Sequence, residues 1–116
     1  MAITLHPTGK TRIIVADAQE LVADGLRYRL ADAADLHIIA HVGTGKELLD
    51  LLKEKPADLV LLDVSLPGMD GIELARVIKA ERAIAGTRLI MLSSAMLSAQ
   101  SQERADAGVV CHLTKP

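Results

Sequence analysis

The sequence predicts an α/β domain in which crossover helices connect the strands of a doubly wound, five-stranded parallel sheet. Short runs rich in Leu and β-branched residues alternate with stretches in which apolar residues recur at helical spacing, and this alternation is typical of parallel α/β proteins. The 116 residues are enough for one domain with one core. Half of the residues are apolar but only Tyr28 is aromatic, so aliphatic side chains and methionine must fill that core.

Five apolar runs have the length and composition of buried strands. They cover residues 12–16, 36–41, 59–62, 88–92 and 109–113. Polar or turn-forming residues bound each run, which is why we expect five separate strands.

Four stretches between these runs have helical spacing. In the first three, the expected core-facing positions are Leu21, Val22, Leu26 and Leu30, then Leu48, Leu49 and Leu52, then Ile72, Ala75 and Ile78. The fourth, at residues 95–107, has few apolar residues after its start, so we expect it to be the least firmly anchored helix. Thr44 and Glu47 have capping-box spacing and predict the start of the second helix.

Charge and composition exclude several classes of function. The net charge is −2 and no Lys/Arg cluster is present, so we expect no direct contact with nucleic acid. No apolar run is long enough to cross a membrane, and the first residues lack the pattern of a signal peptide. The single cysteine, Cys111, cannot form an intrachain disulfide. These features predict a cytoplasmic location.

Four polar residues follow four of the expected strands: Asp17, Asp63, Ser93 and Lys115. In an open parallel sheet, functional groups collect beyond the carboxyl ends of the strands, so these residues should share one edge. A carboxylate can accept a phosphoryl group when a divalent cation, an ammonium and a hydroxyl stabilise the transferred oxygens.

This chemistry assigns a role to each residue of the set. Asp63 is the expected nucleophile. Asp17 and the main-chain carbonyl of Ser65 are the expected further ligands of Mg²⁺. Lys115 and Ser93 are expected to bind phosphoryl oxygens.

The motifs around these residues resemble the receiver domains of two-component response regulators, over essentially the whole chain. The similar segments are IIVAD at 13–17, LLDVSLPGMDG at 61–71, MLSSA at 91–95, and AG at 107–108 leading to LTKP at 113–116. The resemblance implies a flavodoxin-like sheet with strand order 2-1-3-4-5, phosphorylation of Asp63, a switch hydroxyl on Ser93 and a cis bond between Lys115 and Pro116.

The resemblance also implies partners. A sensor histidine kinase would donate the phosphoryl group, and a homodimer is one expected state. The segment LVADGL at 21–26 resembles receivers that precede a helix-turn-helix DNA-binding domain. We therefore expect residues 1–116 to be a receiver domain, a signalling module rather than an enzyme, that ends after its fifth strand without the family's terminal helix. An output domain beyond Pro116 is expected if the chain is truncated there.

Two residues depart from the family pattern. Ala18 stands where a second acidic residue usually follows the first strand, which predicts weaker Mg²⁺ binding. His112 stands where a switching Tyr or Phe is common, and it is either a switch residue sensitive to pH or an ordinary strand residue.

The departure at Ala18 leaves an alternative, a pseudo-receiver that binds proteins without phosphorylation. A flavin- or nucleotide-binding enzyme would need a glycine loop after the first strand, and the acidic residues Asp17 and Glu20 disfavour it there.

Overall fold

All strands in the part of the chain that the structure describes belong to one parallel sheet. The computed structural model describes residues 11–63, 66–68, 70–93 and 109–114, the last six and Ser93 by their main chain. The strands are β1 (Thr11–Ala16), β2 (Leu36–Val42), β3 (Leu59–Asp63), β4 (Arg88–Ser93) and β5 (Val109–Thr114). Their spatial order is β2-β1-β3-β4-β5, with every neighbouring pair parallel. The expected parallel α/β class is confirmed, and each strand agrees with its expected range to within one residue at either end.

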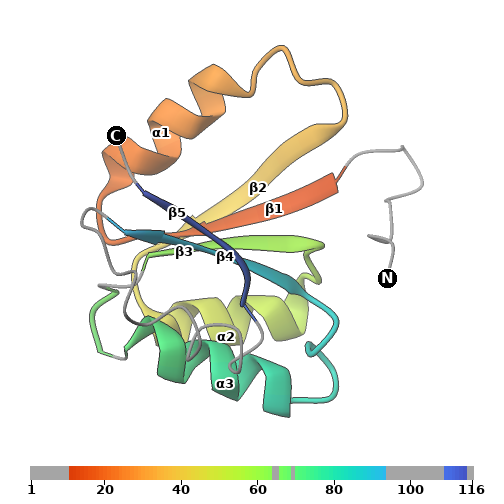
Figure 1. Cartoon of the computed structure of the whole chain (residues 1–116). Coiled ribbons are helices and arrows are strands. Elements are labelled where there is room, and N and C mark those ends of the chain that lie inside the picture. The colour runs from red at the N-terminus through yellow and green to blue at the C-terminus, as the bar shows by residue number, and fades with distance from the viewer. Residues whose placement is uncertain (1–10, 64–65, 69, 94–108, 115–116) are drawn as a thin grey trace.

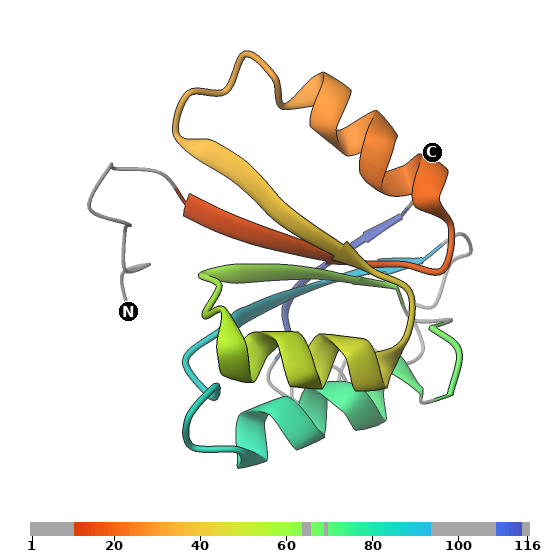
Figure 2. The same ribbon diagram turned by 180° about the vertical axis from the view of Figure 1, so that it is seen from behind.

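Helices cover both faces of this sheet. They are α1 (Glu20–Arg29), α2 (Gly45–Glu54) and α3 (Gly71–Ala80). Figures 1 and 2 show α1 on one face of the sheet and α2 and α3 together on the other. The weak helical pattern at 95–107 lies outside the described residues, within which no helix is both long and apolar enough to cross a membrane.

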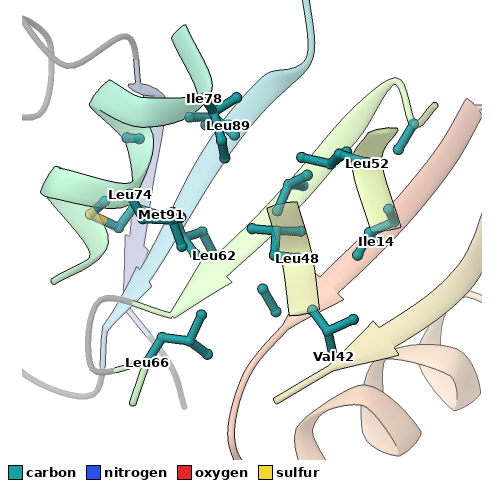
Figure 3. Close-up of a cluster of buried hydrophobic side chains, with 14 of the residues drawn as sticks. Ile14, Val42, Leu48, Leu52, Leu62, Leu66, Leu74, Ile78, Leu89 and Met91 are labelled. Atoms are coloured by element: carbon teal, nitrogen blue, oxygen red, sulfur yellow. The ribbon is translucent and has the colours of Figure 1, made fainter. Parts of the chain in front are cut away.

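The larger core lies between the sheet and the pair α2–α3 (Figure 3). Leu48 of α2, Leu62 of β3 and Ile78 of α3 are all fully buried in it. The side chains of β3 alternate between this core and the one on the α1 face, so the strand is apolar along its length. The predicted core positions Leu48, Leu52, Ile72, Ala75 and Ile78 are confirmed as buried.

The face covered by α1 is less completely buried. Ala23 is the buried residue of α1, and Leu26 and Leu30 pack against the same cluster while remaining partly exposed. The prediction that Leu21 faces the core is wrong, because its side chain is 83% exposed. Leu21 precedes Ala23 by two residues, which turns it by about 200° around the helix axis and away from the sheet.

The start of α2 is capped by side chains. The main-chain N–H of Glu47 donates to the Thr44 hydroxyl oxygen at 3.2 Å. The Thr44 hydroxyl in turn donates to Oε1 of Glu47 at 3.1 Å. The expected cap at Thr44 is thus present, with the carboxylate accepting from the Thr44 side chain.

A partly buried ion pair between Arg12 and Asp58 joins the strands at the end of the sheet opposite their carboxyl ends. Asp58 precedes β3, and its Oδ2 accepts from the main-chain N–H of Arg12 at 2.7 Å and from Arg12 Nε at 3.3 Å. The main chain of Asp58 donates to Arg12 O and accepts from the N–H of Arg88. Asp58 therefore connects the starts of β1, β3 and β4 and helps to set the register between these strands.

A lysine holds the connection from α3 to β4. Lys79 Nζ donates to the carbonyl oxygens of Ala85, at 3.0 Å, and Thr87. Burial, together with the nearby charge of Arg88, lowers the pKa of Lys79 from 10.5. The ammonium thus satisfies two loop carbonyls but is partly desolvated.

We expect Asp58→Ala to lower the free energy of unfolding by about 2–3 kcal/mol, because it removes a buried carboxylate that accepts charged and main-chain hydrogen bonds. Urea unfolding measures the change. Asp50→Ala, at an exposed position on α2, is the control and should change stability little. Equal effects of the two substitutions would contradict this role of Asp58.

Lys79 should make stability depend on pH. Between its lowered folded-state pKa and the ordinary value of 10.5, the unfolded chain binds more protons, so the free energy of unfolding rises with pH in that interval. The free energy of unfolding of the wild type, minus that of Lys79→Met, should therefore increase as pH rises from the lowered pKa of Lys79 toward 10.5. Lys53→Met, at an exposed lysine of α2, should show no such growth in urea unfolding.

Candidate functional site

Two buried acidic residues stand at the carboxyl ends of adjacent strands. Ala16 of β1 pairs with Leu62 of β3, so Asp17 and Asp63 occupy the next positions on neighbouring strands. Adjacent strands in a sheet are about 4.8 Å apart. Asp17 is fully buried and Asp63 is 6% exposed. Because burying charge is costly without compensation, two buried carboxylates side by side are typical of a site for a cation.

Three hydrogen bonds position Asp17. Its N–H donates to Val42 O at 3.0 Å, and its Oδ1 accepts from the N–H of Gln19 at 2.8 Å. Its carbonyl oxygen lies 2.6 Å from Nε2 of His41. Since Gln19 is the N-cap of α1, the carboxylate lies at the start of that helix, where the helix dipole favours negative charge.

The loop after Asp63 is held at two described points. Leu66 is 4% exposed and packs into the core formed with α2 and α3. Asp70 caps α3 by accepting from the N–H of Ile72 at 2.8 Å. Between them, Gly68 has φ of 89°, a left-handed conformation that glycine adopts without strain. The LPGMDG motif therefore gives the loop an apolar anchor, a turn and a helix cap.

The ends of β4 and β5 lie at the same edge as the two carboxylates. Asp63 pairs with Leu92, and the next residue, Ser93, pairs with Thr114 at the end of β5. The sheet thus places the main chain of Ser93 beside the end of β3, as expected. His112 of β5 pairs with Met91 of β4. Lys115 and Ser65, and with them the expected Lys115–Pro116 cis bond, lie outside the described residues.

The donor set of the described residues fits a hard cation with few protein ligands. Asp17 and Asp63 supply carboxylate oxygens, and no group of three or more His, Cys, Asp or Glu is present within the described ranges. Ala18, Gln19 and Glu20, which follow Asp17, are exposed. Mg²⁺ in proteins is commonly held by one or two carboxylates, with water and substrate oxygens as its other ligands. Two carboxylates therefore suffice for such a site.

Sequence reasoning did not identify the contribution of β2 to this edge. His41 and Val42 hold the main chain of Asp17, although neither belongs to a motif. Their contact depends on the register between β1 and β2, which the sequence does not reveal. The only available signal was that both residues end an apolar run.

Comparison with known proteins identifies relatives of the whole described fold. A family profile described as the response regulator receiver domain matches residues 13–116. The uncharacterized transcriptional regulatory protein YxjL of Bacillus subtilis is 32% identical over 106 residues, which are 91% of this chain and 48% of the relative. The transcriptional regulatory protein YhcZ of the same organism is 37% identical over 83 residues, 72% of this chain and 38% of the relative. The chain thus spans less than half of either relative.

Solved structures agree with this similarity. A LuxR-family two-component response regulator from Aurantimonas sp. SI85-9A1 has a TM-score of 0.82 and 26% identity, with 91% of this chain and 74% of that chain covered. The response regulator domain of Thermotoga maritima CheB has a TM-score of 0.81 and 27% identity, covering 92% of this chain and 79% of that chain.

Proposed function

The chain belongs to the response regulator receiver domain family, and on that premise we propose that Asp63 accepts a phosphoryl group from a histidine kinase. The observation that supports this most is the placement of Asp63, buried at the end of β3 beside the buried Asp17 at the end of β1. The main chain of Ser93 follows Leu92, the partner of Asp63, and pairs with Thr114 at the end of β5. The function is that of a signalling domain that takes part in its own phosphorylation.

The reaction is a phosphoryl transfer between two side chains. A carboxylate oxygen of Asp63 attacks the phosphorus of a phosphohistidine, forming an O–P bond as the P–N bond breaks. The imidazole of the kinase leaves with the bonding electron pair and takes up a proton. The packed strand β3 fixes the main chain of Asp63 and so limits the motion of the attacking carboxylate.

A magnesium ion would be held by Asp17, Asp63 and the main-chain carbonyl of Ser65. Bound there, it supplies positive charge that offsets the repulsion between the carboxylates and the incoming phosphoryl group. Because Ala18 supplies no second carboxylate after β1, binding is weaker than in receivers with two acidic residues at this point.

Ser93 and Lys115 are the groups that respond to phosphorylation. The Ser93 hydroxyl donates to one phosphoryl oxygen and the Lys115 ammonium pairs with another. Their movement toward the phosphoryl group shifts the segment after β4 between two arrangements and changes a binding surface, and His112 is either a second switch residue or an ordinary strand residue. The new charge on Asp63 is thus converted into a change of partners.

The partners follow from the family. The proposed donor is a sensor histidine kinase in the cytoplasm. The proposed output is transcriptional, through a DNA-binding domain where the chain is part of a longer protein, and a homodimer is one proposed state. The names of YxjL and YhcZ as transcriptional regulatory proteins support this output. The pseudo-receiver alternative, which rests on Ala18, is not favoured.

Incubation with acetyl phosphate and Mg²⁺ should add one phosphoryl group to the chain, and Asp63→Asn should abolish the addition because the amide oxygen is a poor nucleophile. Intact-mass analysis measures the product. Asp50→Asn, at an exposed acid, should be phosphorylated as the wild type is. If no adduct forms at any Mg²⁺ concentration, or if Asp63→Asn is still phosphorylated, Asp63 is not the phosphoacceptor.

Ala18→Asp should strengthen Mg²⁺ binding by roughly tenfold, because affinity for a hard cation rises with the number of carboxylate ligands. Position 18 is exposed, so the new side chain needs no space in the core. Isothermal titration with Mg²⁺ measures the change, and Ala18→Asn is the control because it has the same shape without the charge. Equal affinities of the Asp and Asn variants would show that the missing charge is not what limits binding.

A further inference from the structure

A shift of register in β2 determines which face His41 occupies. Ile13 of β1 pairs with Ile38, but the next residue, Ile14, pairs with Ala40, so β2 contains one additional residue at this point. Ile39 and Ala40 both pack toward the core of α2 and α3, whereas Ile38 belongs to the core on the α1 face. Because side chains alternate along a strand, the additional residue returns His41 to the α1 face.

His41 there meets the first residue of the loop that leads into α1. Its Nε2 lies 2.6 Å from the carbonyl oxygen of Asp17. Since a carbonyl oxygen can only accept, Nε2 must carry the hydrogen, which fixes the tautomer of a neutral imidazole. The ring is partly buried, so solvent competes with this bond less than at an open surface.

Two neighbouring residues at the end of β2 hold Asp17 from two sides. Val42 O accepts the N–H of Asp17, and His41 donates to its carbonyl, so the peptide groups before and after Asp17 are both tied to β2. The Gln19 N–H fixes Oδ1 of the carboxylate. Because Ala18 is next in sequence, Asp17 is the one acidic residue at the junction of β1 and α1 before Glu20. The position of its carboxylate therefore matters more for cation binding than it would if two acidic residues stood there.

We propose that His41 is a positioning residue, which holds the Asp17 main chain so that its carboxylate is oriented to bind the cation beside Asp63. This inference rests on the magnesium site of the proposed function. Groups that orient a metal ligand from outside the coordination sphere commonly change metal affinity by about 10–100-fold. His41 acts through Asp17 and touches neither the metal nor the phosphoryl group.

Matched substitutions separate the hydrogen bond from the packing of the ring. His41→Met has similar length without an N–H donor, and His41→Gln has a terminal amide that can donate to the same carbonyl. His37→Met changes an exposed histidine of the same strand and is the control. All four proteins are studied as full chains, with thermal unfolding used to compare their stability.

In the absence of metal, ¹⁵N spectra of the wild-type His41 ring should show a hydrogen on Nε2, the nitrogen that faces the Asp17 carbonyl. The carbonyl ¹³C resonance of Asp17 should move in His41→Met and return toward the wild-type position in His41→Gln. A wild-type Nε2 without a proton, or an Asp17 carbonyl resonance unchanged in His41→Met, would overturn the proposal.

Titration with Mg²⁺ alone, followed by the amide resonances of Asp17 and Asp63, tests the consequence. His41→Met should weaken binding by about tenfold, the lower end for such outer groups, and His41→Gln should recover most of the loss while His37→Met binds normally. Wild-type affinity in His41→Met, no recovery in His41→Gln, or an equal loss in His37→Met overturns the role of His41 alone. No Mg²⁺ binding by the wild type overturns the magnesium site itself, and this inference with it.

Discussion

The pairing of β1 with β3 is the constraint on which the rest of the site depends. Because Ala16 lies opposite Leu62, the two following residues, Asp17 and Asp63, must emerge side by side at one edge of the sheet. A slip of one residue would send one carboxylate to the other face of its strand. Asp58 stabilises this register from the opposite end of the strands, where its hydrogen bonds link Arg12 of β1 and Arg88 of β4 to the start of β3. An ion pair remote from the site thus contributes to its geometry.

Packing supports the two carboxylates unequally. The loop after Asp63 is anchored by Leu66 in the core shared with α2 and α3, where whole side chains are removed from water. Asp17 leads instead into α1, whose contact with the sheet is made by Ala23 and by partly exposed leucines. Hydrogen bonds from the end of β2 therefore hold the main chain of Asp17 in place, whereas apolar packing holds the loop after Asp63. At the start of α1, we therefore expect substitutions that remove polar contacts to displace Asp17 more than substitutions of core residues.

The sequence was most informative where burial alone decides the structure. The run LVLL at residues 59–62 of β3 is entirely apolar because both faces of the strand are covered, so its position was predicted closely. Leu21 was assigned to the wrong side of α1 because Leu21, Val22 and Leu26 are apolar around more than one face, and tertiary contact selects the face containing Ala23. The paired carboxylates followed from the ends of strands. The role of His41 could not be predicted, since it depends on one additional residue in β2 that no composition pattern marks.

The electrostatics of the two carboxylates tie stability to function. Like charges on neighbouring strands repel, and the repulsion is stronger at buried positions than in water. A third carboxylate at position 18 would add to the repulsion in the metal-free domain and to the attraction for a cation in the same measure. On the proposed function, Ala18 would reduce both effects, so that the domain carries less unfavourable charge without metal and gains less stability when Mg²⁺ binds. In the proposed magnesium site, the placement of the Asp17 carboxylate would then matter more for affinity, and the bonds from β2 to the Asp17 main chain would supply that placement.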